Sequence, residues 1–202
     1  MARYTGPRVK KARRYGAPIF ANAAVLRMRR TNPPGPRPLR RRKVSDRGLQ
    51  LNEKQKVRYA YGLMEKQFRR YYERAVKHSG VTGDQLMISL ERRLDNVVFR
   101  LGLAGTRAQA RQLVTHGLVA VNGKKLDIPS AETSVGDAIA FSDRGKRSNY
   151  IDLVKEDIQA REVPGWLEVD RDQLTGRIAA LPGAGDYEAH FNPSAIVEYY
   201  SR

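Results

Sequence analysis

Residues 90–125 read LERRLDNVVFRLGLAGTRAQARQLVTHGLVAVNGKK and form the centre of the predicted fold. In the first part, Leu90, Leu94, Val97, Val98 and Leu101 follow the three-and-four spacing that places apolar side chains on one side of a helix. This spacing predicts a helical segment that opens near residue 82 and buries its apolar side in a core.

A second, shorter helix and a hairpin follow in the same stretch. Thr106 with Gln109 forms a capping box, the pattern that satisfies the first amide groups of a helix. The dipeptide Asn122-Gly123 then separates the apolar residues 118–121 from two lysines, and Asn-Gly is the strongest short signal for a two-residue β-hairpin turn. The order helix, helix, hairpin predicts a small unit of mixed structure.

Upstream of this stretch, residues 52–78 predict one long helix. Asn52 is interpreted as its N-cap, and Val57, Phe68 and Tyr71 lie on its apolar side. An aromatic stripe of this kind is typical of a helical core, and a platform for stacking RNA bases is the alternative.

Downstream of the hairpin, the sequence predicts further strands and one last helix. Residues 135–141 fit a turn and a strand, residues 164–167 fit a short strand, and a helix is expected after Pro193. The glycines near residue 183 lack the strand–turn–helix setting of a phosphate-binding loop, so we interpret them as a plain loop. The fold class is therefore α+β.

Charge is distributed unevenly along the chain. Lys and Arg number 38 against 21 Asp and Glu, a net charge of +17, and residues 1–50 contain only one acidic residue, Asp46. Such an excess attracts polyanions, so nucleic acid or an anionic membrane is the expected partner. Prolines between residues 32 and 38 favour extended backbone. We predict that residues 1–50 form an extended arm that orders on a phosphate-rich surface, and a solvated tail is the alternative.

Several other kinds of site find no support in the sequence. There is no cysteine, which excludes disulfides and thiolate metal sites, and no apolar run approaches the ~20 residues of a membrane span. The three histidines, His78, His116 and His190, are far apart, so neither a catalytic site nor a metal site is expected. The Arg-rich and acid-poor start leaves an organelle transit peptide open, although Ser45 is its only serine.

Three motifs resemble a known RNA-binding module. Residues 90–100, 106–114 and 121–125 look like the αL module that is named after the small-subunit ribosomal protein S4. The module also occurs in rRNA pseudouridine synthases and tyrosyl-tRNA synthetases, so by itself it indicates only structured RNA. Segments along nearly the whole chain resemble the ribosomal protein itself: residues 1–8, 51–57, 61–62, 66–71, 163–167 and 196–202. The chain is therefore identified as a member of the S4 family.

The resemblance implies an α+β fold in which an RNA-binding module is inserted into a helical domain. The module would consist of two short helices, a β-hairpin and a small antiparallel sheet. The implied organisation is a basic arm at 1–50, a helical domain at 51–90 completed by a helix at 187–202, the module at 91–155, and strands and loops that continue the sheet at 156–186.

The resemblance also implies a function. It predicts a structural protein of the small ribosomal subunit, with no enzyme activity and no cofactor, that binds a multi-helix junction of small-subunit rRNA and helps to nucleate assembly. The expected location is the cytoplasmic ribosome near the side where mRNA enters, as a monomer beside neighbouring ribosomal proteins and mRNA, with an organellar ribosome left open. A free translational repressor or RNA chaperone is the alternative, and an rRNA-modifying enzyme is disfavoured because only about 50 residues follow the module.

The predicted RNA contacts are basic and polar residues of the arm, the long helix and the module. They are Arg3, Arg8, Lys10, Lys11, Arg13, Arg14, Arg40, Arg41, Arg42, Lys43, Lys54, Lys56, Arg69, Arg70, Arg92, Arg93, Asn96, Arg107, Arg111, Gln112, His116, Asn122, Lys124 and Lys125. Glu91 and Asp95 lie one turn apart beside the arginines, so internal ion pairs are the alternative for Arg93 and Arg111.

The chain departs from the family pattern at two places. Many members carry a zinc-binding cysteine cluster in the arm, whereas Val9 and Ala12 stand where its first pair is expected. We therefore expect the arm to be ordered by RNA and not by metal. Members often have a second histidine after His116-Gly117, where this chain has Leu118, so a base contact by that side chain is not carried over.

Overall fold

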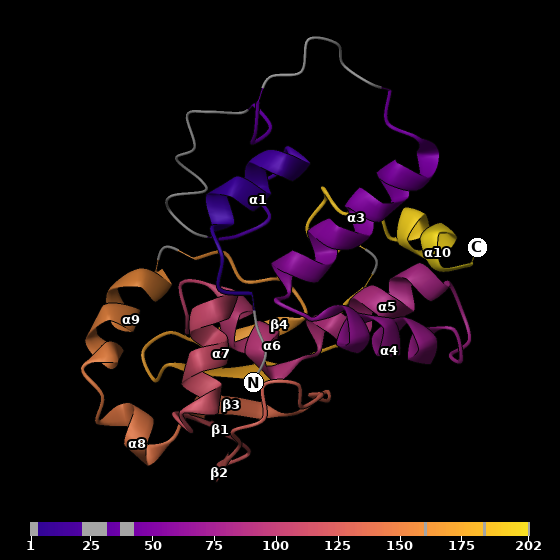
Figure 1. Cartoon of the computed structure of the whole chain (residues 1–202). Coiled ribbons are helices and arrows are strands. Elements are labelled where there is room, and N and C mark those ends of the chain that lie inside the picture. Colours follow the sequence, from indigo (N-terminus) through magenta and orange to yellow (C-terminus); the bar gives the residue numbers. More distant parts are fainter. Residues whose placement is uncertain (1–3, 22–31, 37–42, 160, 184, 202) are drawn as a thin grey trace. The chain divides into compact units, whose positions relative to one another are not determined.

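The structure is a computed structural model that describes residues 4–21, 32–36, 43–159, 161–183 and 185–201 (Figure 1). The chain divides into two compact units. Unit 1 comprises Met1–Met87 and Tyr187–Arg202, and unit 2 comprises Ile88–Asp186. Over the described residues, no helix has the length and apolar character of a membrane span.

The first helix of the long predicted segment begins earlier than expected. α3 (Asp46–Ala60) starts behind Ser45, whose hydroxyl accepts a hydrogen bond from the Gly48 amide at 3.2 Å. The prediction of Asn52 as the N-cap is therefore wrong, because that residue lies within the second turn of α3. A serine cap satisfies an amide at the start of the helix in the same way that asparagine would have done.

The predicted long helix is also interrupted. Gly62 has φ +66°, a left-handed conformation that glycine adopts without a steric penalty, and α4 (Glu65–Ala75) begins after it. Tyr61 and Leu63 on either side of the glycine are buried, which explains why the apolar pattern continues through the break.

The core of unit 1 is completed by the last helix, α10 (Pro193–Ser201), which packs on α3 as Figure 1 shows. Tyr200 stacks on Tyr72 with ring centroids 4.6 Å apart and on Phe68 at 6.3 Å. Phe68 and Tyr71 are buried. The prediction of a final helix and the interpretation of the aromatic stripe as core are both confirmed.

Part of the arm is helical. α1 (Arg8–Tyr15) buries Ala12 against Ala17 and Ile19, and Tyr59 of α3 packs on this small cluster. The prediction of an extended arm is therefore wrong for this part, because the charged and alanine residues between Pro7 and Gly16 are good helix formers. Residues 32–36 contain neither helix nor strand.

The helical segment predicted from residue 82 is also two helices. α5 (Thr82–Glu91) contains the boundary between the units, and α6 (Leu94–Arg100) follows after a break. Arg93 has extended backbone there, with φ −66° and ψ 135°, and forms a single β-bridge with Glu132. The apolar residues counted in the sequence are buried on both sides of the break.

The second helix of the module starts as predicted. α7 (Arg107–Thr115) is capped by Thr106, whose hydroxyl accepts a hydrogen bond from the Gln109 amide at 3.2 Å. The Gln109 side chain reaches back and accepts from the Gly105 amide at 2.9 Å. The predicted cap at Thr106 is confirmed, and the return bond of the box is made to the amide just before the N-cap residue.

Unit 2 contains a five-stranded antiparallel sheet in the order β2-β1-β3-β5-β4. The predicted hairpin is confirmed, since Asn122 and Gly123 both have positive φ in the two-residue turn between β1 and β2. The strands are β1 (Val119–Val121), β2 (Lys124–Lys125), β3 (Ala138–Phe141), β4 (Leu167–Asp170) and β5 (Thr175–Ile178).

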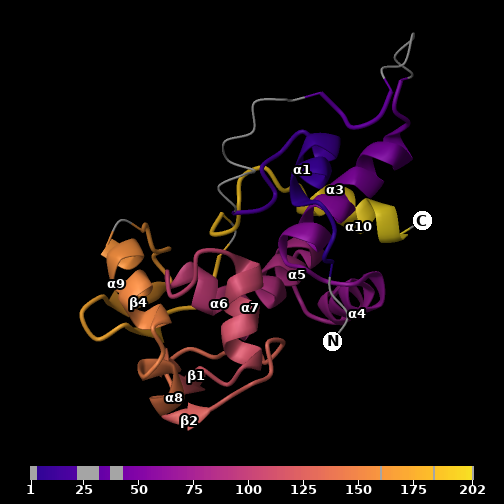
Figure 2. The same cartoon turned by 60° about the vertical axis from the view of Figure 1, so that its left-hand side comes forward.

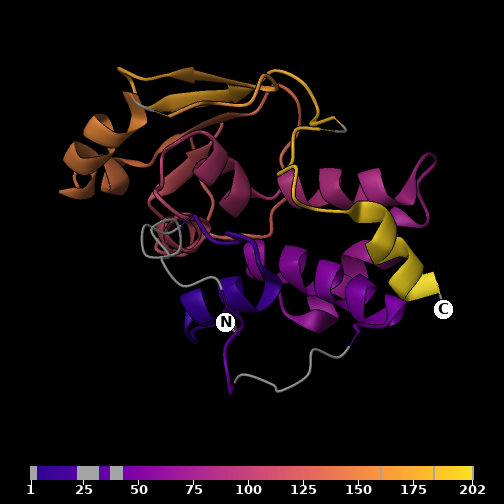
Figure 3. The ribbon, with the colours of Figure 1, turned by 90° about the horizontal axis from the view of Figure 1, so that it is seen from above.

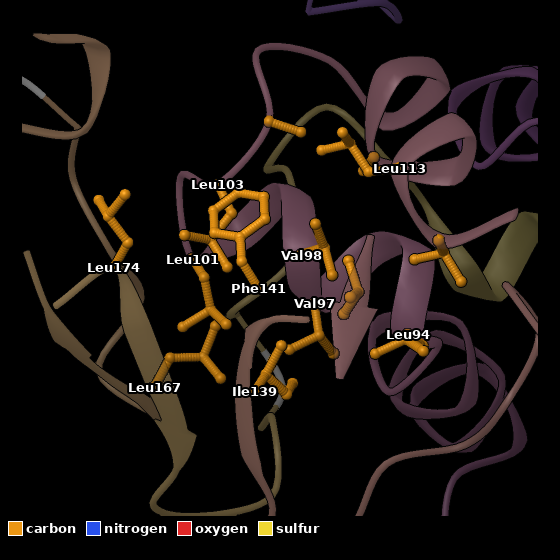
Figure 4. Packing of buried hydrophobic residues seen from close by; sticks show 14 of the residues in the cluster. Leu94, Val97, Val98, Leu101, Leu103, Leu113, Ile139, Phe141, Leu167 and Leu174 are labelled. Carbon is orange, nitrogen blue, oxygen red and sulfur yellow. The ribbon is translucent and has the colours of Figure 1, made fainter. Parts of the chain in front are cut away.

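The core of unit 2 lies between this sheet and its helices. In Figure 3, α6 and α7 lie along one side of the sheet, and Figure 4 shows Val98, Leu113, Ile139 and Phe141 meeting in the interior. Gly176 allows the close approach of α6 to β5, because a Cβ at this position would lie 2.6 Å from Cδ1 of Leu101.

Two helices after β3 were not predicted. α8 (Asp143–Lys146) is a single turn capped by Ser142, and α9 (Tyr150–Gln159) buries Val154 and Ile158 in the core of unit 2. One charged turn and a helix with few buried residues give little apolar periodicity, which is why the sequence pattern did not reveal them.

Candidate nucleic-acid interface

The hairpin of unit 2 carries two exposed lysines. Lys124 and Lys125 form the short edge strand β2, and both side chains are exposed. The Lys125 side chain crosses Gly117, so its Nζ lies 3.0 Å from the position that a Cβ of Gly117 would take. This places the ammonium group beside the end of α7, where Gln112 and His116 are exposed one turn apart.

Helix α8 lies against the same end of α7. The Ser142 amide donates to the Leu118 carbonyl and the Ser142 hydroxyl to the Gly117 carbonyl, both at 2.9 Å. A Cβ on Gly145 would collide with the Leu118 carbonyl oxygen, so the α8 turn is in close contact with this segment. Figures 1 and 2 show α8 next to β1 and β2.

These adjoining elements carry a group of exposed basic side chains, which we call the hairpin–α8 surface. Within the described part of the chain, no carboxylate forms an ion pair with its lysines and arginines. One of them, Arg147, donates from Nε to the Asp143 carbonyl at 3.2 Å. The surface consists of His116, Lys124, Lys125, Arg144, Lys146 and Arg147, all exposed.

Arg93 and Arg111, by contrast, are occupied within the protein. Arg93 makes two hydrogen bonds to the Asp95 carboxylate, from Nε at 3.1 Å and from Nη2 at 2.8 Å. Arg111 reaches the same carboxylate from α7, with Nη1 2.9 Å from Oδ2. Arg93 is 1% exposed and Arg111 8%. The predicted contact of these two arginines with RNA does not agree with their burial, and the alternative of internal ion pairs is what the structure has.

A second carboxylate holds the neighbouring cation. Glu91 is fully buried and accepts two hydrogen bonds from Arg100, at 2.9 and 2.7 Å. It also accepts from Asn96 Nδ2 at 2.6 Å, while Asn96 Oδ1 accepts from Arg107 Nε at 2.7 Å. The Arg107 guanidinium lies 4.7 Å from the centre of the Phe99 ring. Asn96 is 1% exposed, so its burial also disagrees with the predicted direct contact with RNA.

Arg92 is partly buried and belongs to the same region. Its Nε donates to the Thr133 carbonyl at 2.9 Å, while its own carbonyl accepts from the Thr133 amide and hydroxyl. Arg92 therefore ties the break between α5 and α6 to the loop before β3. The two carboxylates and their partners hold α6, α7 and this loop together, which is a structural task and not one of RNA contact.

The predicted contacts of unit 1 divide in the same way. Lys54 is 3% exposed and its Nζ lies 2.6 Å from Glu65 Oε1, so the predicted contact of Lys54 with RNA is not supported. Lys56 pairs with Glu53 at 2.6 Å and the exposed Arg69 with Glu73 at 3.0 Å. Four cations on α3 and α4 were predicted to contact RNA. Among them, only the exposed Arg70 forms no ion pair with a carboxylate within the described residues.

Glu65 joins three helices of unit 1, namely α3, α4 and α10. It accepts hydrogen bonds from Lys54 of α3 and, at 2.8 Å, from the Tyr200 hydroxyl of α10. Burial opposes ionisation of Glu65, but the Lys54 and Tyr200 hydrogen bonds and the Arg58 charge outweigh it and lower its pKa. Burial and the same carboxylate raise the pKa of Tyr200.

Two cations, one from the arm and one from α3, lie close to the ring of Tyr59. Lys11 Nζ lies 4.7 Å from the centre of the Tyr59 ring, and the Arg58 guanidinium lies 4.4 Å from the same ring. Burial alone would raise the pKa of Tyr59, but these two cations lower it. Arg13 donates to the Asn32 carbonyl at 2.9 Å. This part of the arm is therefore held by contacts within the protein.

The remaining predicted contacts of the arm differ in exposure. Lys10, Arg14 and Lys43 are exposed and Arg8 is partly buried. Arg3, Arg40, Arg41 and Arg42 lie outside the residues that the structure describes. Among the described residues, no group of three or more His, Asp or Glu side chains could hold a metal ion.

The sequence pattern did not identify Arg144 and Lys146 of α8, or Arg147 directly after it, as candidate RNA contacts. The run DRGKR at residues 143–147 is a basic cluster, and that was the available signal. A cluster of three cations gives no indication of where it lies, however. Its place beside the hairpin depends on the two hydrogen bonds of Ser142, which a sequence pattern does not contain.

Comparison with known proteins gives a consistent result along the chain. Residues 3–91 match the family "Ribosomal protein S4/S9 N-terminal domain", and residues 92–139 match the S4 domain. The chain is 47% identical to the small ribosomal subunit protein uS4 of Dehalococcoides mccartyi and 48% to that of Akkermansia muciniphila. It is 50% identical to the uS4 protein of Roseiflexus castenholzii. All three alignments cover the whole of both chains.

Proposed function

Because the chain belongs to the uS4 family of small ribosomal subunit proteins, we propose that it is a ribosome-bound structural protein that binds small-subunit rRNA. The family is one of ribosomal structural proteins and not one of enzymes. The sequence resemblance and the cationic surface of unit 2 both support the same partner.

The observation that carries the proposal is the hairpin–α8 surface. Five lysines and arginines are exposed on adjoining elements of unit 2, and their charges are not used in ion pairs within the described residues. Phosphate oxygens bind such cations, and folded RNA is recognised mainly by its shape and its phosphate and 2′-hydroxyl groups. A rigid cationic surface on a packed unit suits that form of recognition.

The proposed direct contacts differ from those expected from the sequence. We assign RNA contact to exposed cations and polar groups and to the partly buried Arg8, and structural pairing to the buried residues around Asp95, Glu91 and Glu65. The proposed contacts are Arg8, Lys10, Arg14, Lys43, Arg70, Gln112, His116, Lys124, Lys125, Arg144, Lys146 and Arg147.

The finer parts of the proposal rest on the family resemblance. The RNA target is a multi-helix junction of small-subunit rRNA that is bound early in assembly, on the side of the subunit where mRNA enters. Neighbouring ribosomal proteins and mRNA are the further partners. The functional division is an arm at 1–50, a helical domain at 51–90 with 187–202, and an RNA-binding module at 91–155 that is continued by 156–186.

Sedimentation tests the proposal directly. The tagged full-length chain, expressed in a bacterium, should travel with small subunits through a sucrose gradient and remain with them at moderate salt. A chain that stays at the top of the gradient, or that binds only free mRNA, would contradict the ribosomal role. A variant with Lys124, Lys125, Arg144, Lys146 and Arg147 changed to Ala should compete poorly with the unchanged chain for the subunits.

A further inference from the structure

We propose that Asn122 and Asp137 form a clamp that sets the position of the hairpin lysines before RNA binds. Asn122 is then a positioning residue and not an RNA contact, in contrast to the expectation from the sequence. The inference rests on the proposed RNA-binding function and adds to it the residues that give the hairpin tip its shape.

The first part of the clamp joins the turn to strand β3. The Asn122 amide donates to the Ala138 carbonyl at 2.8 Å, and Asn122 Oδ1 accepts from the Ala138 amide at 2.9 Å. In an ordinary antiparallel pair the second bond would be made by a backbone carbonyl. At Asn122 the backbone turns away with φ +51°, and the side-chain oxygen takes the place of that carbonyl. The side chain therefore extends the β1–β3 ladder by one residue.

The second part of the clamp is a carboxylate. Asn122 Nδ2 donates to Asp137 Oδ1 at 2.8 Å, and the other oxygen of Asp137 accepts from the Ser134 amide at 2.7 Å. The Asp137 carbonyl accepts from the Ile178 amide at 3.1 Å. Asp137 thus connects the hairpin turn to the loop before β3 and to β5 at the same time.

The hairpin needs such a clamp because β2 is very short. It contains two residues and pairs only with β1, and a two-stranded ribbon of this size has little stability of its own. Lys124 follows the turn directly, so a change in the turn moves its ammonium group. A charge held in place in advance loses less conformational freedom when it meets a phosphate.

The same contacts determine what Asn122 can offer to RNA. Its amide oxygen and one of its two N–H groups are used within the protein. The neighbouring Lys124 and Lys125 have no side-chain hydrogen bond or ion pair in the described residues. The structure therefore assigns recognition to the lysines and their placement to Asn122 and Asp137.

Two variants of the full-length chain separate positioning from contact. Asn122→Asp places two carboxylates face to face and breaks the clamp, whereas the exchange Asn122→Asp with Asp137→Asn restores it with the donor on the other side. In the exchanged pair, the amide introduced at position 137 donates to the carboxylate introduced at position 122. The oxygen of that amide can still accept from the Ser134 amide. The exchanged variant also has the same net charge as the unchanged chain.

The measurements are the affinity for purified bacterial small-subunit rRNA and the amide hydrogen exchange of residues 122–126. Asn122→Asp should bind about tenfold more weakly, which corresponds to one charge-assisted contact. Its hairpin amides should exchange faster, and the exchanged pair should recover most of both properties. Recovery distinguishes the clamp from a direct contact, because a carboxylate at position 122 would still repel a phosphate if that side chain touched the RNA.

Three results would overturn the inference. In the first two, the exchanged pair binds rRNA as weakly as Asn122→Asp, either with or without recovered protection of the hairpin amides. In the third, Asn122→Asp binds rRNA as tightly as the unchanged chain. If the proposed function itself were wrong, the binding measurement would give a different result. In that case the unchanged chain binds rRNA no better than a plain RNA duplex of equal length, and the exchange data alone then support or reject the clamp.

Discussion

Two pairs of cations in unit 2 have the same charge but opposite environments. Arg93 and Arg111 converge on the buried carboxylate of Asp95, whereas Lys124 and Lys125 lie exposed on the hairpin without a carboxylate partner in the described residues. In the sequence, both pairs are basic residues of one RNA-binding motif. The difference shows that the partners supplied by the tertiary structure decide whether a cation stabilises the fold or remains available to an RNA phosphate.

The energetic reason for this difference is solvation. A buried charge loses its hydration, and it is tolerated only when a partner of opposite charge and further hydrogen bonds replace the lost water. Removal of Asp95 would take the Asp95 carboxylate away from two buried arginines. An exposed lysine keeps its hydration, so its removal costs the fold little while it takes away a charge that a phosphate could bind.

The largest expected effect is therefore at Asp95. Asp95→Ala should lower the free energy of unfolding of unit 2 by about 3–5 kcal/mol, the usual cost when one partner of a buried ion pair is removed. The single tryptophan, Trp166, lies in the core of unit 2 and reports its unfolding in urea by fluorescence.

Asp127→Ala is the matched control for this substitution, because Asp127 is an exposed aspartate of the same unit. It should change the stability by no more than about 0.5 kcal/mol. A loss below about 1 kcal/mol for Asp95→Ala would mean that the arginines of the network do not depend on this carboxylate.

At the hairpin, the effect should be on binding and not on stability. Lys124→Ala should weaken rRNA binding about ten- to a hundredfold, because a charge-assisted contact contributes about 1.5–3 kcal/mol. The urea concentration at which the Lys124→Ala variant is half unfolded should not change. Arg93→Met should show the reverse, with reduced stability and unchanged affinity of the folded fraction, when both variants are studied by urea unfolding and RNA titration. If the two variants lost equal stability, the buried arginines and the hairpin lysines would not differ in their contribution to the fold.

The contribution of α8 should appear in the salt dependence. Binding of a phosphate by a cation releases counterions, so the slope of log K against log salt should fall by roughly 0.9 for each contact with an RNA duplex that is lost. Replacement of Arg144, Lys146 and Arg147 by Ala should flatten the slope by about 1 to 3. Lys155→Ala on α9, an exposed lysine of the same unit, should leave it unchanged. If the triple variant kept the original slope, the basic residues at α8 would not contact the RNA.

The smallest expected effect concerns Glu65, a carboxylate of unit 1 whose side chain is 47% exposed. Its pKa is lower in the folded chain than the ordinary value of 4.5, so its stabilisation is complete above that pH and is lost as the pH falls through the folded pKa. Glu65→Gln should therefore lose less helical circular dichroism than the unchanged chain between pH 5 and about pH 3. Because solvent screens this pair, the difference should be below about 1 kcal/mol. Identical acid unfolding of the two proteins would contradict this role of Glu65.

Much of the fold could be predicted because it depends on local patterns. The hairpin follows from Asn122-Gly123, the start of α7 from the Thr106 capping box, and the buried side of α6 from apolar spacing. The breaks at Gly62 and Arg93 were missed because buried residues continue on both sides of each. A count of apolar positions does not distinguish one helix from two that share a core.

The candidate site could be predicted only in part, for a physical reason. Basic residues are visible in the sequence, but their partners are brought together by tertiary structure. Arg111 meets Asp95 from sixteen residues away, and α8 reaches the hairpin through Ser142 and Gly117, twenty-five residues apart. The one-turn spacing of Glu91 and Asp95 made an ion pair with Arg93 possible, but it did not decide between that pair and an RNA contact. No spacing in the sequence predicted that Lys54 is buried against Glu65.

Lysine acylation of the protein, free and bound to small-subunit rRNA, tests whether the hairpin–α8 surface faces the RNA. Lys155 of α9 should be modified equally in both states, since it is exposed and is not one of the proposed RNA contacts, and the buried Lys54 should resist modification in both. Lys124, Lys125 and Lys146 should react in the free protein and be protected when RNA is bound. If these three lysines remained as reactive in the complex as Lys155, the hairpin–α8 surface would not face the RNA.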